Sequence, residues 1–265
     1  MFNTITQLQD FNPDHVSVTY GAGGTTRSKT HDLVCEIQKK TNLSVVSHLT
    51  CVGHSRQEIR ELLQDYSQSG IENILALRGD PPHGGANFIP AQDGFAYAEE
   101  LVAFIRQEFP HMGIGVAGFP EGHPACPNRL KEIEYLKRKV DAGADYICTQ
   151  LFFDNRDFYD FRERCELAGI TVPILAGLMP ITSLANMRKI SELALGSRIP
   201  AKLLKSIHRS EEYVENIGIH WAAEQVNDLL EEGVKGIHFY TLNKAEQIQR
   251  ICSSIGIVDS DQLNT

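Results

Sequence analysis

Residues 73–82, NILALRGDPP, place a cation, a glycine and a carboxylate directly after a short apolar run. The two prolines that follow stop any regular structure, so Arg78, Gly79 and Asp80 fall where a strand ends. A surface salt bridge between Arg78 and Asp80 is one interpretation of these residues. A catalytic mouth is the other, in which Gly79 allows close backbone approach and the carboxylate stabilises a developing cation on a substrate.

Polar residues also follow other predicted strands. The groups are Thr19-Tyr20-Gly21, His48-Leu49-Thr50, Phe119-Pro120-Glu121, Thr149-Gln150 and Tyr240-Thr241. In a parallel α/β barrel the functional groups collect at the carboxyl ends of many strands, whereas an open doubly wound sheet concentrates them at one switch point. The distribution along this chain favours the barrel.

Apolar β-rich segments alternate with amphipathic helical segments. The predicted strands are 15–20, 43–50, 72–77, 113–118, 145–153, 172–178 and 236–241, and the predicted helices are 3–10, 27–40, 55–68, 93–109, 128–142, 155–168, 183–194, 209–232 and 243–254. The strands are apolar throughout, which predicts a parallel sheet buried on both faces. A helix precedes the first of the seven strands. We therefore expect a (β/α)8 TIM barrel with its first β-strand missing, in a single domain over 1–265 without a separate regulatory domain.

Two glycine-rich segments could bind a nucleotide. GIGVAG (113–118) matches G-x-G-x-x-G, but its glycines lie inside a predicted strand and no helix starts promptly after it. Close packing of a barrel strand is therefore a better interpretation than a dinucleotide fingerprint. YGAGGTT (20–26) joins a strand to a helix, and its backbone N–H groups could cradle a phosphate or approach a flat ring. A flexible connection is an equally good interpretation of that segment.

Other polar residues have a structural interpretation beside a functional one. His48, Cys51 and His54 recur at intervals of three, but a strand running into a loop does not present that spacing on one face, so we expect no metal site. His48 is better interpreted as a hydrogen-bonding group at the barrel mouth. Arg138 and Lys139 lie near the end of a predicted helix, where position alone favours interaction with the helix dipole over a phosphate contact.

The composition of the chain limits the kinds of partner and cellular environment that we expect for it. The 265 residues carry a net charge of −9, which argues against a nucleic-acid or anionic-membrane surface. No stretch approaches the roughly 20 apolar residues that a membrane helix needs. The six cysteines contain no C-x-x-C pair, and with no recognisable signal peptide they predict reduced thiols in a cytoplasmic protein.

Seven segments occur in an order that resembles the methylenetetrahydrofolate reductase family: VSVTYGAGG, HLTC, LALRGDPP, FPEGHP, LKRKVDAGAD, TQLFFD and HFYTLNK. The resemblance covers about residues 10–255. It implies a barrel that binds FAD at the carboxyl ends of its strands and takes hydride from NADH or NADPH. The same site then reduces methylenetetrahydrofolate to methyltetrahydrofolate for methionine synthesis, in a ping-pong mechanism. The resemblance further implies a homo-oligomer, and the sequence leaves the choice between NADH and NADPH open.

The resemblance also assigns roles to matched residues. It implies FAD contacts at Thr19, Tyr20, Ala22, His48, Arg78, Gly79, Asp80, Ala96, Phe119, His123, Arg138 and Lys139. His123, Arg138 and Lys139 match residues at the pyrophosphate and adenosine end, which reverses the helix-dipole interpretation. Asp80 matches the aspartate that favours a cationic iminium. Gln150 matches the amide that contacts both folate and nicotinamide, so these two residues are the expected catalytic pair and also bind folate.

The chain departs from the family pattern at three points. Phe119 stands where some members have Tyr, so a flavin-directed hydroxyl is lost while the ring remains. Lys244 stands where many members have Arg, and it can meet the folate glutamate tail without bidentate geometry. The family's first strand, roughly F-E-F-F-P-P, carries the general-acid Glu, which is expected upstream of Met1. Without that Glu, folate reduction should fall about 10²–10⁴-fold while flavin reduction by NADH survives.

Two other functions compete with an active reductase. A flavin- or folate-binding remnant without activity would account for the missing Glu. A phosphate-binding aldolase of the same barrel class needs a Schiff-base lysine or metal ligands at a strand end, and no lysine lies inside the predicted strand tips.

Overall fold

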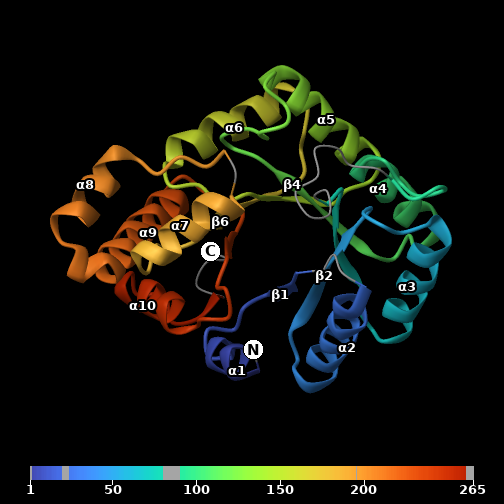
Figure 1. Cartoon of the computed structure of the whole chain (residues 1–265), viewed down its shortest axis with the longest axis horizontal. Coiled ribbons are helices and arrows are strands. Elements are labelled where there is room, and N and C mark those ends of the chain that lie inside the picture. Colours follow the sequence, from blue (N-terminus) through green and yellow to red (C-terminus); the bar gives the residue numbers. More distant parts are fainter. Residues whose placement is uncertain (1, 20–23, 80–89, 195, 261–265) are drawn as a thin grey trace. The chain divides into compact units, whose positions relative to one another are not determined.

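The computed structural model describes residues 2–19, 24–79, 90–194 and 196–260. Seven strands occur in this part of the chain: β1 (His15–Val18), β2 (Ser44–Thr50), β3 (Asn73–Leu77), β4 (Gly113–Gly118), β5 (Tyr146–Thr149), β6 (Ile174–Leu178) and β7 (Ile237–Phe239). Their order in the sheet is their order in the chain, β1 to β7 (Figure 1). This is the order of a (β/α)8 barrel, with one strand fewer than eight among the described residues.

Helices separate the strands as the sequence pattern predicts. They are α1 (Phe2–Gln9), α2 (Gly24–Lys40), α3 (Arg56–Gln68), α4 (Ala98–Glu108), α5 (Arg129–Asp141), α6 (Asn155–Leu167), α7 (Leu184–Leu193), α8 (Ala201–Arg209), α9 (Val214–Glu231) and α10 (Glu246–Ser254). A 3₁₀ turn, Glu211–Tyr213, lies between α8 and α9. None of the described helices is long and apolar enough to cross a bilayer.

The chain divides into two compact units, each described here by itself. Unit 1 comprises Met1–Pro13, Gly118–Tyr135 and Cys148–Thr265, and unit 2 comprises Asp14–Ala117 and Leu136–Ile147. In unit 2 the strands β1 to β4 pair in parallel, with Val16 opposite Val45 and Ile74 opposite Ile114. In unit 1 the strands β6 and β7 pair in parallel, with Gly177 opposite His238.

In unit 2 helix α3 is fixed at its start and along its buried face. Ser55 caps the helix: its hydroxyl accepts the Glu58 backbone N–H at 3.2 Å, and its own N–H donates to Glu58 Oε2 at 2.7 Å. This reciprocal capping box satisfies two helix-terminal donors. Farther along, fully buried Tyr66 accepts a hydrogen bond from the Ser47 hydroxyl of β2 at 2.9 Å. The bond holds α3 against the strand that carries His48.

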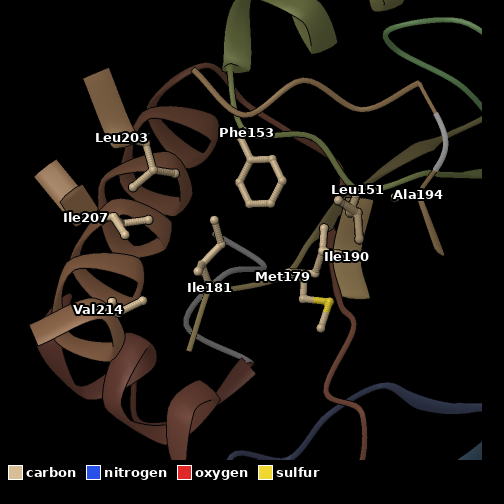
Figure 2. Packing of buried hydrophobic residues seen from close by; sticks show 9 residues of the cluster. All are labelled: Leu151, Phe153, Met179, Ile181, Ile190, Ala194, Leu203, Ile207 and Val214. Atoms are coloured by element: carbon tan, nitrogen blue, oxygen red, sulfur yellow. The ribbon is translucent and has the colours of Figure 1, made fainter. Parts of the chain in front are cut away.

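The core of unit 1 is built from strand ends and helices α7 and α8. Its buried cluster consists of Leu151, Phe153, Met179, Ile181, Ile190, Ala194, Leu203, Ile207 and Val214 (Figure 2). Leu203 and Ile207 are one turn apart on α8, so they present one apolar face to the ring of Phe153 and to Ile181 (Figure 2). Burial of these side chains supports the connections that follow β5 and β6.

The structure corrects three sequence expectations. The predicted helix 209–232 begins only at Val214. A separate helix, α8, which the pattern did not indicate, ends at Arg209, and the N–H of the following Ser210 donates to the Ile207 carbonyl. The predicted strand 145–153 ends at Thr149 because the Leu151 N–H donates to the Gln150 side chain instead of to a neighbouring strand. The strands β1 and β7 are mostly half-buried rather than buried on both faces.

Candidate active site

Four of the predicted flavin contacts lie at neighbouring strand ends in unit 2. Thr19 directly follows β1, His48 lies in the second half of β2, and Arg78 and Gly79 directly follow β3. The parallel register pairs Val18 with Ser47 and Thr50 with Leu77, so these residues share the carboxyl-terminal edge of the strands. Thr19 is exposed there, and the other three are half-buried.

His48 is half-buried, and one of its ring nitrogens, Nε2, is fully buried. Its Nε2 has no hydrogen-bond partner among the described residues. Burial lowers the pKa of His48 to about 4, so the ring is neutral at physiological pH. A neutral imidazole offers one donor and one acceptor, which suits a polar heterocycle better than a phosphate.

Gly79 is restricted to glycine by its backbone and by its surroundings. Its φ of +84° lies in the left-handed region. A Cβ at this position would stand 2.7 Å from Val52 Cγ2 and 3.0 Å from Thr50 Cβ. The chain therefore turns tightly after β3 and presents bare backbone at the strand end.

The remaining predicted contacts of unit 2 differ in their surroundings. Lys139 Nζ donates to the Ala117 carbonyl at 2.6 Å, near the end of β4, whereas the Arg138 side chain is exposed. The half-buried Ala96 donates its backbone N–H to Glu100 Oε2 at 2.8 Å, just before α4. Lys139 thus braces a strand end, and a phosphate contact from it remains a prediction.

In unit 1, Phe119 and His123 lie in the connection after β4. Their rings meet edge to face with centroids 4.7 Å apart. His123 Nδ1 accepts the Ala125 N–H at 3.1 Å, and the His123 backbone N–H donates to Glu132 Oε1 at 2.7 Å. Because Nδ1 is an acceptor, the proton of the neutral ring is on Nε2, which makes Nε2 a donor.

Gln150 follows β5 and is likewise oriented by the backbone. Its N–H donates to the Gly118 carbonyl at 2.8 Å, and its Oε1 accepts the Leu151 N–H at 3.0 Å. The amide oxygen is therefore used within the protein. Since the NH₂ group donates to none of the described residues, it is the part of the side chain that could donate to a ligand. This orientation suits an acceptor on a nicotinamide or pterin ring.

Lys244 lies on the rim of a pocket at the carboxyl ends of β6 and β7. The pocket is shallow and open to solvent, and it is lined by Met179, Pro180, Thr182, Asn186, Tyr240, Thr241, Leu242, Lys244, Gln247 and Ile248. The Lys244 side chain is exposed, and its backbone N–H donates to the Thr241 carbonyl at 2.9 Å. The pocket thus combines apolar walls with one cation.

Unit 1 also contains polar residues that the sequence places at strand ends but to which it assigns no individual role in the site. Thr149 Oγ1 accepts the Gly177 N–H at 2.8 Å, and the Thr149 carbonyl accepts the Tyr240 hydroxyl at 2.8 Å. A Cβ on Gly177 would stand 2.3 Å from that carbonyl oxygen. Glu121 is the other such residue, and its place in FPEGHP was the signal that could have drawn attention to it.

Three predicted site residues, Tyr20, Ala22 and Asp80, lie outside the described residues. Within the described ranges, no three His, Cys, Asp or Glu side chains gather as metal ligands would. Cys51 is buried and its Sγ lies 3.4 Å from the Leu77 carbonyl, and burial raises the pKa of this thiol to about 12. All six cysteines are free.

A parallel α/β chain with polar groups at successive strand ends belongs to the barrel class of enzyme folds. A solved structure from Clostridium thermocellum, an uncharacterized protein that binds two copies of 5-methyl-5,6,7,8-tetrahydrofolic acid, has a similar fold: the TM-score is 0.53 at 16% identity, over 98% of this chain and 100% of that one. The predicted fold class, a barrel lacking one strand, is thereby confirmed.

The chain belongs to the methylenetetrahydrofolate reductase family, whose model matches residues 1–256. It is 38% identical over 260 residues to the 5,10-methylenetetrahydrofolate reductase of Salmonella typhimurium, covering 97% of this chain and 85% of that protein. It is 36% identical over 277 residues to methylenetetrahydrofolate reductase (NADH) 1 of Arabidopsis thaliana, covering all of this chain and 47% of that protein. The chain thus spans about half the length of the plant relative, and the resemblance stated from the motifs is confirmed.

Proposed function

We propose that this protein reduces 5,10-methylenetetrahydrofolate to 5-methyltetrahydrofolate, with NADH or NADPH as the reductant and FAD as the bound cofactor. The observation that carries this proposal is the 38% identity over 97% of the chain to a bacterial 5,10-methylenetetrahydrofolate reductase. The strand ends that the motifs single out hold oriented, partly unused polar groups, which agrees with a site for a flavin and a pterin. One-carbon metabolism leading to methionine is the corresponding pathway.

One observation in unit 2 fits a flavin. Buried His48 Nε2 lacks a partner among the described residues, and a bound ring with polar edges would supply one. At Gly79 the place of a Cβ is filled by Val52 and Thr50, so packing within the protein requires this glycine. When bound, FAD supplies a two-electron carrier between the nicotinamide and the folate. Thr19, Arg78 and Ala96 would hold its ring and ribityl part, together with Tyr20 and Ala22.

In this proposal, different residues hold the two ends of the FAD cofactor. His123, with Nε2 as a donor, and the cations Arg138 and Lys139 would hold the pyrophosphate and adenosine of the cofactor. The ring of Phe119 would pack beside the flavin. Each group would bind or orient the cofactor without taking part in proton transfer.

For the folate, the proposed roles follow from charge and hydrogen-bonding capacity. The Asp80 carboxylate would stabilise the iminium cation that methylenetetrahydrofolate forms on ring opening, because opposite charges attract strongly in a site with little water. The Gln150 NH₂ would orient first the nicotinamide and then the pterin, as a ping-pong mechanism requires. Lys244 would pair with the glutamate tail. A homo-oligomer is the expected assembly.

Anaerobic flavin spectroscopy tests the proposal. The purified chain, loaded with FAD, should lose its visible flavin absorption on addition of NADH or NADPH. Methylenetetrahydrofolate should restore this absorption only slowly in the chain without the general-acid Glu, since loss of a general acid typically costs about 10²–10⁴-fold. Conversion of the folate is followed in parallel by chromatography of methyltetrahydrofolate. Failure to bind FAD, or flavin absorption that neither nucleotide changes, would overturn the proposal.

A further inference from the structure

The segment that follows β5 is held by side chains from other parts of unit 1. Gln150 leads into this segment, and the Leu151 N–H turns back to Gln150 Oε1 at 3.0 Å. Each of the next three backbone carbonyls accepts a hydrogen bond from a side chain far away in the sequence. The Leu151 carbonyl accepts from Ser197 Oγ at 2.7 Å, the Phe152 carbonyl from Gln225 Nε2 at 3.3 Å and the Phe153 carbonyl from Trp221 Nε1 at 2.9 Å.

Two of these donors stand on a helix whose own place is fixed. Trp221 and Gln225 are one turn apart on α9, so they lie on the same face of the helix. A Cβ on Gly218 would stand 1.8 Å from the Ile181 carbonyl oxygen, so the backbone of α9 lies directly against the connection after β6. Buried Gln225 is oriented further by Asn155, whose Oδ1 accepts from Gln225 Nε2 at 3.0 Å. The donors therefore have little freedom to follow a moving segment.

The third donor, Ser197, lies in the connection between α7 and α8 and is anchored to the core. It is half-buried, and its backbone N–H donates to the Ala194 carbonyl at 3.0 Å. Ala194 and Leu151 belong to the same buried cluster (Figure 2). The Ser197 hydroxyl thus binds the carbonyl of the residue whose N–H orients the Gln150 amide.

Both polar backbone groups of Leu151 are therefore used, the N–H on Gln150 and the carbonyl on Ser197. Removal of a donor leaves a carbonyl without its partner, and a buried acceptor without a partner is costly. The segment would then turn to find another donor, and the Leu151 N–H that holds Gln150 would turn with it. The side chains of Phe152 and Phe153 are buried, so such a turn would also disturb their packing.

We infer that Ser197, Trp221 and Gln225 are positioning residues for Gln150: they hold the segment after β5 so that the Gln150 NH₂ faces the ligand. They act through Gln150 and are not themselves catalytic residues. The inference rests on the proposed function, in which Gln150 orients the nicotinamide, and it goes beyond that function because these three residues lie away from the strand ends.

Anaerobic stopped-flow measurement of flavin reduction in the FAD-loaded protein tests the inference. The nucleotide is whichever of NADH and NADPH reduces the native flavin. Ser197→Ala and Gln225→Met should each slow the reduction about tenfold at saturating nucleotide, since a displacement of about 1 Å can cost 10²-fold. In a Gln150→Ala background the same two changes should have no further effect, because the side chain that they position is gone. Ser197→Thr, which keeps the hydroxyl, should react at the native rate.

Tyr159→Phe and Ser206→Ala are the matched controls. The Tyr159 hydroxyl donates to Asp228 Oδ2 at 2.5 Å between α6 and α9, and Ser206 Oγ donates to the Lys202 carbonyl at 3.1 Å within α8. Both variants lose a hydrogen bond that does not involve the segment after β5, so both should keep the native rate.

The outcomes separate the inference from the proposed function. Equal losses from Ser197→Ala and Gln225→Met in both backgrounds would show that these residues act elsewhere, and a native rate in Gln150→Ala would show that there is nothing to position. Either result overturns the inference while the proposed function stands. A flavin that neither nucleotide reduces in the native protein would overturn the proposed function and the inference with it.

Discussion

Glu121 Oε1 accepts the backbone N–H of Arg198 at 2.8 Å, which joins the connection after β4 to the connection between α7 and α8 within unit 1. The two segments approach closely beside this bond: a Cβ on Gly196 would stand 3.1 Å from the Gly122 carbonyl oxygen. The other carboxylate oxygen of Glu121, Oε2, is buried without a partner among the described residues. The connection that carries Phe119 and His123 is therefore held by a carboxylate with one unsatisfied oxygen.

Replacing Glu121 should change how stability depends on pH. Burial raises the pKa of Glu121 from 4.5 to about 7, and Asp157 adds to the rise against the lowering effect of the Arg198 N–H and of the Arg198 and Arg129 guanidinium groups. The folded state thus holds this proton more tightly than the unfolded state. The resulting stabilisation is complete below about pH 4.5 and is lost as the pH rises through about 7.

We expect Glu121→Gln to become more stable relative to the native protein as the pH rises from 5 to 8. Free energies of unfolding in urea at both pH values measure the effect. Glu134→Gln, at an exposed position on α5, is the control and should show a much smaller change. A Glu121→Gln difference that is independent of pH would contradict the assignment.

Gly79→Ala should destabilise the protein more than Gly70→Ala. Both glycines have positive φ, +84° and +76°, so alanine is strained by about 1–2 kcal/mol at either position. A Cβ on Gly70 meets nothing within 4 Å, whereas on Gly79 it approaches Val52 Cγ2 to 2.7 Å. The difference in unfolding free energy between the two variants therefore isolates the crowding at the end of β3. Equal losses would show that the strand end relaxes without cost.

Loss of the Asn155 side chain should destabilise the joint between α6 and α9. Buried Asn155 donates from Nδ2 to the Gln225 carbonyl at 2.9 Å and to Asp228 Oδ2 at 2.7 Å, and its Oδ1 accepts from Gln225 Nε2 at 3.0 Å. Asn155→Ala removes these three hydrogen bonds, which should cost about 1–3 kcal/mol. Gln225 Nε2 keeps its bond to the Phe152 carbonyl, and Asp228 Oδ2 keeps its bond from the Tyr159 hydroxyl. A double-mutant cycle with Gln225→Ala, followed by thermal unfolding, should give strong coupling between the two residues. Additive losses would argue against a shared network.

His48 should remain neutral in mildly acidic solution. Burial lowers the pKa of this ring from 6.5 to about 4. A histidine with a lowered pKa contributes its stabilisation fully above about pH 6.5, and this is lost as the pH falls through about 4. NMR of the ring carbons should show the neutral form at pH 5.5, with exposed His208 as the reference resonance. A protonated His48 at that pH would mean that the end of β2 is open to water.

The sequence predicts strands and helices well where the apolar residues of a segment follow a single spacing, that of a helix or that of a strand. The residues Ile59, Leu63 and Tyr66 form the buried stripe of α3, and the predicted strand 113–118 matches β4. The break before Val214 escaped prediction because residues 209–232 keep a helical pattern across it, while the Ser210 N–H bonds back to Ile207 and ends α8.

The residues of the candidate site likewise fall into those that the sequence alone identifies and those that only the structure reveals. Positions at strand ends, such as His48 and Gln150, could be found from residue type and chain position, since a polar group after an apolar run is visible in one sequence. The position of Glu121 depends on Arg198, 77 residues away, and the orientation of the Gln247 amide, which donates to Glu215, depends on another helix. Such pairings arise from tertiary packing, which local patterns do not encode.

Helix α1 is eight residues long, and Ile5 is its single buried residue among those described. A helix of this length is marginal by itself, so its docking depends on contacts such as Thr4 with Asn243 and Gln249 with Gln7. In the β7–α10 loop, Leu242 and Asn243 both have positive φ, +45° and +62°. A ligand of the neighbouring pocket that binds only this form of the loop must therefore also favour docked α1, and docked α1 must favour the ligand by the same factor. Occupancy of the pocket should slow amide hydrogen exchange in the first turns of the chain, far away in sequence from the residues that bind.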